Sequence, residues 1–258
     1  MFDTIRVRVD ERGVAQLMLN RPQKRNAMSG EMIAELTQAA EQLGSDATVR
    51  VVVLSGADGQ FCAGGDLNWM RAQINADAAT RAAEAGKLAA MLGALNAMPK
   101  PLIGRIEGGA FGGGVGLACI CDVAYADPQA KFGLTETKLG LLPATIGPYV
   151  IARMGEGRAR RVFMSSRVFD APESVDLGVI AAVTDDLDAR IETEITAYLA
   201  CAPGAVAEAK ALAQRLGAAP GEAEVAASIQ ALVTRWDNPE SAEGVGAFFD
   251  KRKPNWAV

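Results

Sequence analysis

Short apolar runs that read as buried strands alternate with amphipathic helical segments in the first half of the chain, and this alternation constrains the fold most strongly. The predicted strands cover residues 15–19, 51–54 and 102–106. Between the first two, apolar side chains recur at helical spacing from Met32 to Leu43, with Ser29 as a candidate N-cap and Glu31 in the first turn. Strand, helix and strand in this order indicate an α/β core.

The alternation continues along the chain and then gives way to helices alone. A helical pattern runs from about residue 66 to 98, with an interruption near 75–77, and ends at Pro99, which cannot continue a helix. A further helix starts in the glycine run 112–114, and a strand follows at 122–126. Ala-rich helical segments fill the end of the chain, at 188–201, 204–217, 221–235 and 239–250. We predict an α/β core carrying the active site over residues 1–187 and a helical C-terminal region over residues 188–258.

Composition excludes several classes of function. Half of the 258 residues are hydrophobic, which is enough for a large buried core. The net charge of −5 argues against a nucleic-acid partner, because tracking phosphates requires clustered Lys and Arg, and the basic run at 251–253 is short. No apolar run approaches the roughly 20 residues of a membrane helix, and the N-terminus lacks a signal-peptide pattern. We therefore expect a cytoplasmic protein without a membrane partner.

The chain contains no histidine. This rules out Ser-His-Asp and Cys-His catalysis and every histidine-ligated metal or haem site. The four cysteines show no CxxC spacing, and Cys119 and Cys121 lie in an apolar stretch typical of a core. General acid or base chemistry must therefore come from Asp, Glu, Lys, Tyr or Cys.

Two glycine-rich turns, FCAGGDL at 61–67 and GGAFGGG at 108–114, each follow a predicted buried strand and precede a helix. Backbone without Cβ lets a ligand come close, and free N–H groups at a helix start attract an anion or oxyanion. The alternative is that the glycines only permit tight turns and close packing. A nucleotide-binding reading is disfavoured because neither turn matches a P-loop or the dinucleotide spacing.

A third segment, KFGLTETKLGLLP at 131–143, places Glu136 in an apolar, glycine-punctuated stretch. A carboxyl group buried there would have a raised pKa, which suits proton transfer. The alternative, favoured by this segment alone, is a surface Glu136 paired with Lys138 or Lys131.

Taken together, these segments resemble a known family. NRP at 20–22 with NAM at 26–28, then FCAGGDL, GGAFGGGVGL, FGLTETKLGLLP and the closing FFDKRKPNW occur in order over essentially the whole chain. They resemble the enoyl-CoA hydratase/isomerase (crotonase) superfamily. The resemblance implies a spiral of repeated β-β-α units, a helical C-terminal region that assembles homotrimers or homohexamers, and no metal or redox cofactor, since coenzyme A is part of the acyl-CoA thioester substrate.

The resemblance also implies roles for single residues. The N–H groups of Ala63 and Gly113 would form an oxyanion hole for the thioester oxygen, and Glu136 matches a catalytic glutamate. Arg25 and Lys251 fall where the family contacts the coenzyme A nucleotide, with Lys251 reaching a neighbouring subunit. The other residues placed against the substrate are those of the first glycine turn, Gly64, Gly65, Asp66 and Leu67.

One position departs from the family pattern. Hydratases that use two acids carry a second glutamate three residues after the middle glycine, where this chain has Gly116. Several further motifs are most similar to the methylglutaconyl-CoA and isohexenylglutaconyl-CoA hydratase branch. They are GGGVGL, Thr135-Glu136, PATIGPYV at 143–150 and Arg160-Arg161. We therefore expect hydration of a branched 2-enoyl-CoA, such as the carboxylated 3-methylglutaconyl-CoA. A Δ3,Δ2-enoyl-CoA isomerase using the single Glu136 and a non-catalytic acyl-CoA-binding protein are the alternatives.

With a single acid, a hydratase would need that acid both to activate the water and to protonate C2, or it would need a second group to help. Glu107 and the distal carboxylate of the substrate are the candidates for that second group. The candidates for shaping the acyl pocket are Trp69, Met70, Phe132 and Ile146, and those for reading a distal carboxylate are Arg71 and Lys138.

Overall fold

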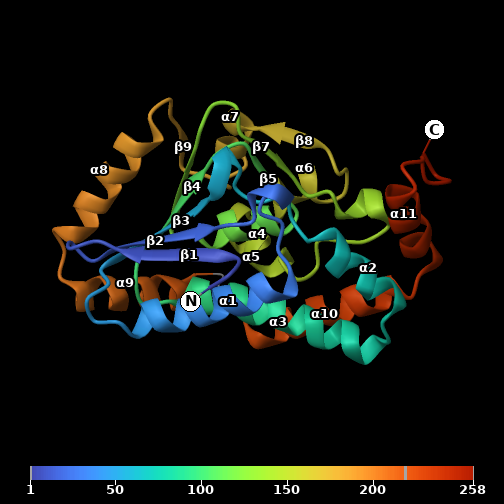
Figure 1. Cartoon of the computed structure of the whole chain (residues 1–258), viewed down its shortest axis with the longest axis horizontal. Helices are drawn as coiled ribbons and strands as arrows, with labels where there is room; N and C mark the ends of the chain where they lie inside the picture. Colours follow the sequence, from blue (N-terminus) through green and yellow to red (C-terminus); the bar gives the residue numbers. More distant parts are fainter. Residues whose placement is uncertain (1, 218–219, 258) are drawn as a thin grey trace.

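The computed structural model describes residues 2–217 and 220–257, and its centre is a six-stranded sheet (Figure 1). The strands lie in the order β1-β2-β3-β4-β6-β9, and only β1 is antiparallel to its neighbour. Their bounds are β1 Ile5–Val9, β2 Val14–Leu19, β3 Val51–Gly56, β4 Leu102–Ile106, β6 Val123–Ala126 and β9 Ala182–Val183. The strands predicted from apolar runs are confirmed. The edge strand β1 was not predicted, because its outward side chains include Arg6 and Arg8.

A second, three-stranded sheet consists of β5 Gly109–Phe111, β7 Lys131–Gly133 and β8 Val168–Asp170. Single bridges extend its pattern, joining Met28 to Gly65 and Cys62 to Ala110. Successive passes of the chain therefore run through a strand of the large sheet, a short extended segment of the second layer and then a helix. This order is the spiral of β-β-α units that the family resemblance implies, and the prediction is confirmed.

Helices follow the strands along the chain, and most of them bury apolar side chains in one core with the large sheet. They are α1 Gly30–Ser45, α2 Leu67–Asn75, α3 Ala78–Ala97 and α4 Gly113–Ile120, followed by α5 Gly147–Met154, α6 Glu156–Phe163 and α7 Ala171–Asp176. Ser29 caps α1 by accepting a hydrogen bond from the Met32 N–H, as predicted. The break near residue 76 is also confirmed, and Asp77 caps the second part of the helical stretch. The sequence did not predict α5 to α7.

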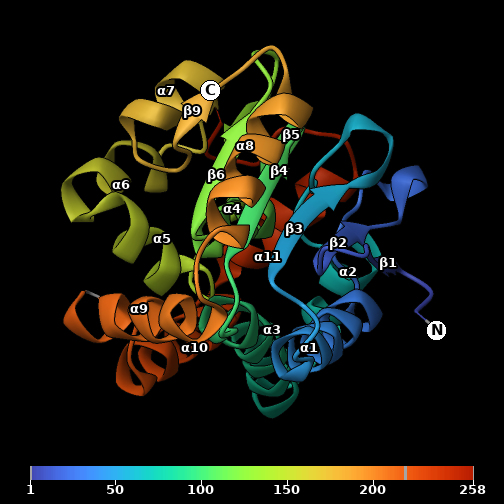
Figure 2. The ribbon, with the colours of Figure 1, turned by 90° about the vertical axis from the view of Figure 1, so that its left-hand side faces the viewer.

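The C-terminal helices are α8 Leu187–Leu199, α9 Pro203–Leu216, α10 Glu222–Trp236 and α11 Pro239–Phe249. All four were predicted, with ends within three residues. Helix α8 packs on the outer face of the large sheet, where Ile191 and Ile195 bury against Val53 and Ile103 (Figure 2). Helices α9 and α10 lie beside α3 and α5, and α11 lies beyond α2 (Figure 1).

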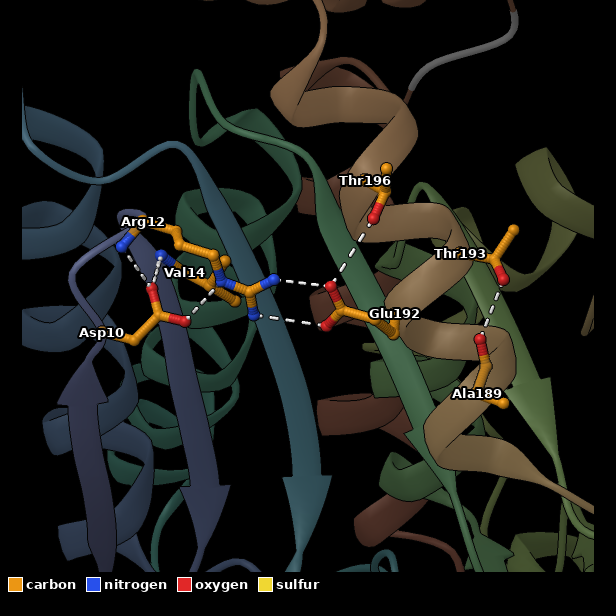
Figure 3. A network of polar contacts seen from close by, with 7 residues as sticks. All are labelled: Asp10, Arg12, Val14, Ala189, Glu192, Thr193 and Thr196. Atoms are coloured by element: carbon orange, nitrogen blue, oxygen red, sulfur yellow. Dashed lines mark hydrogen bonds and ion pairs between the residues drawn. The ribbon is translucent and has the colours of Figure 1, made fainter.

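The hairpin between β1 and β2 is also tied to α8. Arg12 donates to Asp10 in its own turn at 3.0 Å and pairs with Glu192 at 2.5 Å (Figure 3). These side chains are half exposed, so the pairs add little stability. No helix in the described part of the chain has the length and apolar character needed to cross a membrane.

Candidate active site

The two glycine-rich turns lie against each other, backbone to backbone. The Cys62 N–H donates to the Gly109 carbonyl at 2.9 Å, and the Phe111 N–H donates to the Cys62 carbonyl at 3.0 Å. A Cβ at Gly114 would lie 2.5 Å from the Cys62 carbonyl oxygen, which is closer than real Cβ contacts occur. The glycines are therefore required for the close packing of the two turns, as the alternative interpretation of their sequence held, and this packing brings two helix starts together.

Several N–H groups of these turns remain available to a ligand. In the described part of the chain, neither the Gly113 N–H, at the start of α4, nor the Gly65 N–H, just before α2, donates to a protein acceptor. Both residues line one cavity of about 120 Å³. Free N–H groups at the positive ends of two helices can stabilise a negative oxygen between them.

The Ala63 N–H, which was predicted to form part of the oxyanion hole, is already bonded within the protein. It donates to the Arg25 carbonyl at 3.0 Å, and the residue does not line the inner cavity. Arg25 and Asn26 both adopt left-handed backbone conformations, with φ of 49° and 54°, and this bend aims the Arg25 carbonyl at the turn. The residue of the first turn that lines the cavity with an N–H free of a protein acceptor is Gly65, two residues further along.

Glu136 begins the short helix η3 Glu136–Leu139, with two residues between it and the end of β7. Its carboxylate lies against the second turn, because a Cβ at Gly112 would come within 2.9 Å of Oε1. Oε2 is buried and has no hydrogen-bond partner among the described residues. Burial raises the pKa of Glu136 to about 7. Lys131 and Lys138 are exposed and no ion pair joins either to Glu136 in residues 2–217 and 220–257, so the surface-pair alternative is wrong.

Glu136 faces the same cavity as Gly65 and Gly113. The rest of the lining is mostly apolar and comes from distant parts of the sequence: Met28, Ile33, Trp69, Met70, Leu88, Leu141, Leu142, Pro143, Ala144, Thr145, Ile146, Leu232 and Trp236. The described lining includes no Lys or Arg. Trp69, Met70 and Ile146 were predicted to shape the pocket, whereas Leu232 and Trp236 of α10 were not.

Three other candidates lie elsewhere. Phe132 is fully buried and stacks on Phe169, so it belongs to the core. Arg71 lies over the ring of Phe249 in α11 at 4.3 Å. Lys138 is exposed, and none of the three lines the cavity.

An outer groove of about 320 Å³ adjoins the cavity. It gathers five of the residues predicted to contact the substrate, Arg25, Ala63, Gly65, Asp66 and Leu67, together with Lys24 and Phe248. Gly65 lines both the groove and the inner cavity. A ligand running from one to the other would therefore pass the Gly65 N–H.

Asp66 and Gly64 serve the local structure. The Asp66 carboxylate caps α2 and pairs with Arg21 at 3.0 Å. Although burial raises it, the pKa of Asp66 is held below its usual value by hydrogen bonds from the Asn68 and Trp69 N–H groups and from Arg21. Gly64 has φ of +95° and packs on the Phe111 carbonyl. Lys251 is exposed after α11 and lines neither space, so its predicted contact with a neighbouring subunit stays a prediction.

Neither Glu107 nor a cysteine adds a second acid or a nucleophile to the cavity. Glu107 pairs with Arg105 and lines a different groove, between the outer sheet face and α8. Burial raises the pKa of the Cys62 thiol to about 12, which keeps it protonated and unreactive. Among the described residues, Glu136 is therefore the only one that brings a carboxyl group to the lining of this cavity.

The space beyond Gly116, where two-acid hydratases have their second glutamate, is filled by Ile146. A Cβ at Gly116 would lie 2.6 Å from the Ile146 Cγ2 atom. A side chain at this position therefore requires Ile146 to move.

The comparisons with known proteins agree with this geometry. A family model described as enoyl-CoA hydratase/isomerase matches residues 10–258. An enoyl-CoA hydratase from Shewanella pealeana is 36% identical, with 99% of this chain and 97% of that one covered and a TM-score of 0.82. AtuE from Pseudomonas aeruginosa is 39% identical, with coverage of 99% and 100% and a TM-score of 0.80. An enoyl-CoA hydratase from Mycobacterium avium is 30% identical, with full coverage of both chains and a TM-score of 0.86.

Proposed function

Given that this chain belongs to the enoyl-CoA hydratase/isomerase family, we propose that it hydrates a 2-enoyl-CoA thioester, with the Gly65 and Gly113 N–H groups as the oxyanion hole. The observation that carries the proposal is that Gly65 and Gly113, whose N–H groups have no acceptor in the described structure, line one cavity with Glu136, whose buried carboxyl group has a raised pKa. A protein that only bound acyl-CoA would need no such acid.

The chemistry follows from where charge develops. Attack of water on C3 moves electrons toward the thioester oxygen, which becomes an enolate oxygen. N–H donors aimed at that oxygen bind it more strongly in the transition state than in the ground state, and this difference lowers the barrier. Gly65 replaces Ala63 in our assignment because Gly65 lines the cavity and its N–H has no acceptor in the described structure. No metal or redox cofactor takes part in the proposed reaction.

Glu136 carries the proton. As a carboxylate it takes one proton from the attacking water, whose oxygen forms the bond to C3, and as a carboxylic acid it returns a proton to C2. One water is added and Glu136 ends as it began. A pKa of about 7 suits this double use, because both forms are accessible at neutral pH.

The outer groove is proposed to hold the rest of coenzyme A. Lys24 and Arg25 are exposed at its edge, where they can pair with phosphate groups. Lys251 is proposed to reach a neighbouring subunit and to bind the nucleotide part of the coenzyme A ester held there.

The lining of the cavity bears on the acyl group. A distal carboxylate would be buried among apolar side chains with no Lys or Arg in the described lining, which is unfavourable without a paired charge. We therefore propose an uncharged, short or branched acyl chain in place of the carboxylated chain expected from the sequence.

A panel of substrates tests both the reaction and the acyl group. The pair 3-methylcrotonyl-CoA and 3-methylglutaconyl-CoA differs only in the distal carboxylate, crotonyl-CoA is the unbranched reference, and 3-hexenoyl-CoA tests isomerisation. We expect hydration, with a higher kcat/KM for the uncharged member of the pair. Preference for 3-methylglutaconyl-CoA would refute the uncharged assignment, and turnover of 3-hexenoyl-CoA alone would establish the isomerase.

The isomerase remains a second candidate because of one observation. Moving a double bond needs one base that takes a proton from C2 and returns it at C4, and the described cavity lining holds one carboxyl group.

The C-terminal region, residues 188–258, is proposed to assemble trimers or dimers of trimers. Leu212 and Leu216 of α9 are exposed apolar side chains that a neighbouring subunit would cover. Light scattering at micromolar concentration should give a multiple of three chains, and a monomer near 27 kDa would contradict the proposal.

A further inference from the structure

Thr145 carries a buried hydroxyl group that forms no hydrogen bond within the described structure. The residue is 4% exposed, and its Oγ1 atom has no partner. In the part of the chain that the structure describes, Glu136 Oε2 is the other buried side-chain oxygen or nitrogen without a partner. Both residues line the inner cavity. Buried polar groups are normally paired, so a coincidence of two exceptions in one cavity points to a shared ligand.

The cavity suits a small polar ligand next to an apolar one. Its volume of about 120 Å³ is several times the roughly 10–15 Å³ that a water molecule requires on this measure. A trapped water needs two or more polar partners. Most of the lining is apolar, and the Trp69 indole N–H already donates to Glu84. Besides the indole N–H of Trp236, which can only donate, Thr145 and Glu136 are the side chains of the described lining that offer such partners, and both can accept a hydrogen bond from water.

The position of Thr145 is set by the same turn that closes the second-acid position. Ile146, the next residue, occupies the space beyond Gly116. The turn is held by hydrogen bonds from the Ala144 N–H to the Leu142 carbonyl and from the Gly147 N–H to the Ala144 carbonyl, each 2.8 Å long. The chain therefore excludes a carboxylate at 116 and presents a neutral hydroxyl from 145 instead.

We propose that Thr145 is the positioning residue that, with Glu136, holds the water molecule added to C3 and then the 3-hydroxyl group of the product. The Thr145 oxygen accepts a hydrogen bond from the water, while the second hydrogen of the water points at Glu136. In the reaction one O–H bond of the water breaks, its proton goes to Glu136, and the C3–O bond forms. Thr145 neither gains nor loses a proton.

This role rests on the proposed hydratase function and predicts a dependence on oxygen at C3. A saturated acyl-CoA offers Thr145 no partner, whereas a 3-hydroxyacyl-CoA does. Removal of the hydroxyl should therefore weaken binding of the hydroxylated ligand alone. Isomerisation, which uses no water, should not depend on Thr145.

The test uses Thr145→Val, which keeps the shape of the side chain, and Thr145→Ser, which keeps the hydroxyl. Thr193→Val is the matched control, because the Thr193 hydroxyl donates to the Ala189 carbonyl on α8, away from the cavity (Figure 3). We expect Thr145→Val to lower kcat for hydration on the order of tenfold, which is the effect of one hydrogen bond. Its affinity for a 3-hydroxyacyl-CoA should fall by a similar factor in calorimetry, with the affinity for the saturated analogue unchanged. Thr145→Ser should recover most of the rate and affinity that Thr145→Val loses, because it restores the hydroxyl, and Thr193→Val should behave as the parent.

Two outcomes would overturn the role. Hydration at the parental rate by Thr145→Val would show that its hydroxyl does not hold the water. An equal loss of affinity for the hydroxylated and the saturated ligand would show that Thr145 only shapes the cavity. In both cases the parent is a hydratase and the proposed function stands. A parent that hydrates no enoyl-CoA refutes the hydratase itself, and this role with it.

Discussion

Replacing Glu136 with Gln should stabilise the protein at alkaline pH and leave its stability almost unchanged at acid pH. The pKa of Glu136 is raised from 4.5 to about 7 by burial of a carboxyl group whose Oε2 has no partner. Each pKa unit corresponds to about 1.4 kcal/mol. The buried carboxylate therefore lowers the free energy of unfolding by about 3 kcal/mol when it is fully ionised.

The direction follows from linkage. A raised pKa means that the folded state binds the proton more tightly than the unfolded state, so below pH 4.5 ionisation costs nothing. Stability is lost as the pH rises from 4.5 through 7, and the full loss is present above pH 7. Gln cannot ionise, so the difference in unfolding free energy between variant and parent should grow by up to about 3 kcal/mol across this window.

Urea unfolding of parent and Glu136→Gln at several values between pH 5 and pH 8.5, at one protein concentration, measures this difference per chain. Glu107→Gln is the control, because it also removes one carboxylate but one that pairs with Arg105 outside the cavity. If the difference in unfolding free energy between Glu136→Gln and the parent does not change with pH, the Glu136 carboxylate does not destabilise the folded protein and the reasoning is wrong. The variant should also lose 10² to 10⁴ in kcat while still binding the thioester.

Three further substitutions test the rest of the site. Gly113→Pro removes an N–H that no side chain supplies. A variant with parental circular dichroism and oligomer size should lose about 3 kcal/mol of transition-state stabilisation, which lowers kcat by about a hundredfold. An unchanged kcat would exclude this N–H from the oxyanion hole. Gly116→Glu should lower the melting temperature because the new side chain meets Ile146, and adding Ile146→Ala should restore part of the loss. Equal melting temperatures for Gly116→Glu and for the double variant would show that Ile146 is not the obstacle. Lys251→Ala should raise KM for the thioester with little change in kcat, because a nucleotide contact is equally strong in ground and transition states; a fall in kcat at constant KM would contradict that role.

The elements that the sequence predicted are those with a strong local pattern. The buried strands and the long helices have apolar side chains at regular spacing, and Ser29 and Pro99 mark helix ends. The second sheet has no such pattern. Its strand β5 is Gly109–Phe111, three residues whose pairing comes from contact with the neighbouring turn of the spiral. Long-range backbone pairing of this kind is not encoded in local residue preference.

The site was predictable at the level of segments and less so at the level of atoms. Both glycine turns and Glu136 were located from sequence, but which N–H faces the cavity depends on the Arg25 carbonyl, which a left-handed bend aims at Ala63. Leu232 and Trp236 were missed because Leu232 lies 86 residues beyond Ile146, the residue of the cavity lining that precedes it in the sequence. For Thr145 the signal was present, since a threonine in the apolar run LLPATIGP is a polar residue that the turn must bury.

The groups without a protein partner belong to residues that line the same cavity. A buried carboxylate without a partner and a buried hydroxyl without a partner each reduce stability if nothing binds them. Elsewhere in the described structure, buried side-chain polar atoms have partners, so these two side chains do not reflect loose packing in general. The two N–H groups without an acceptor belong to residues that line the same cavity. Their chemistry is also complementary, with donors for a negative oxygen on one side and acceptors for a water or hydroxyl group on the other. A ligand that satisfies all of them must carry an oxygen that becomes negative, beside a carbon to which water adds, and an enoyl thioester during hydration has both.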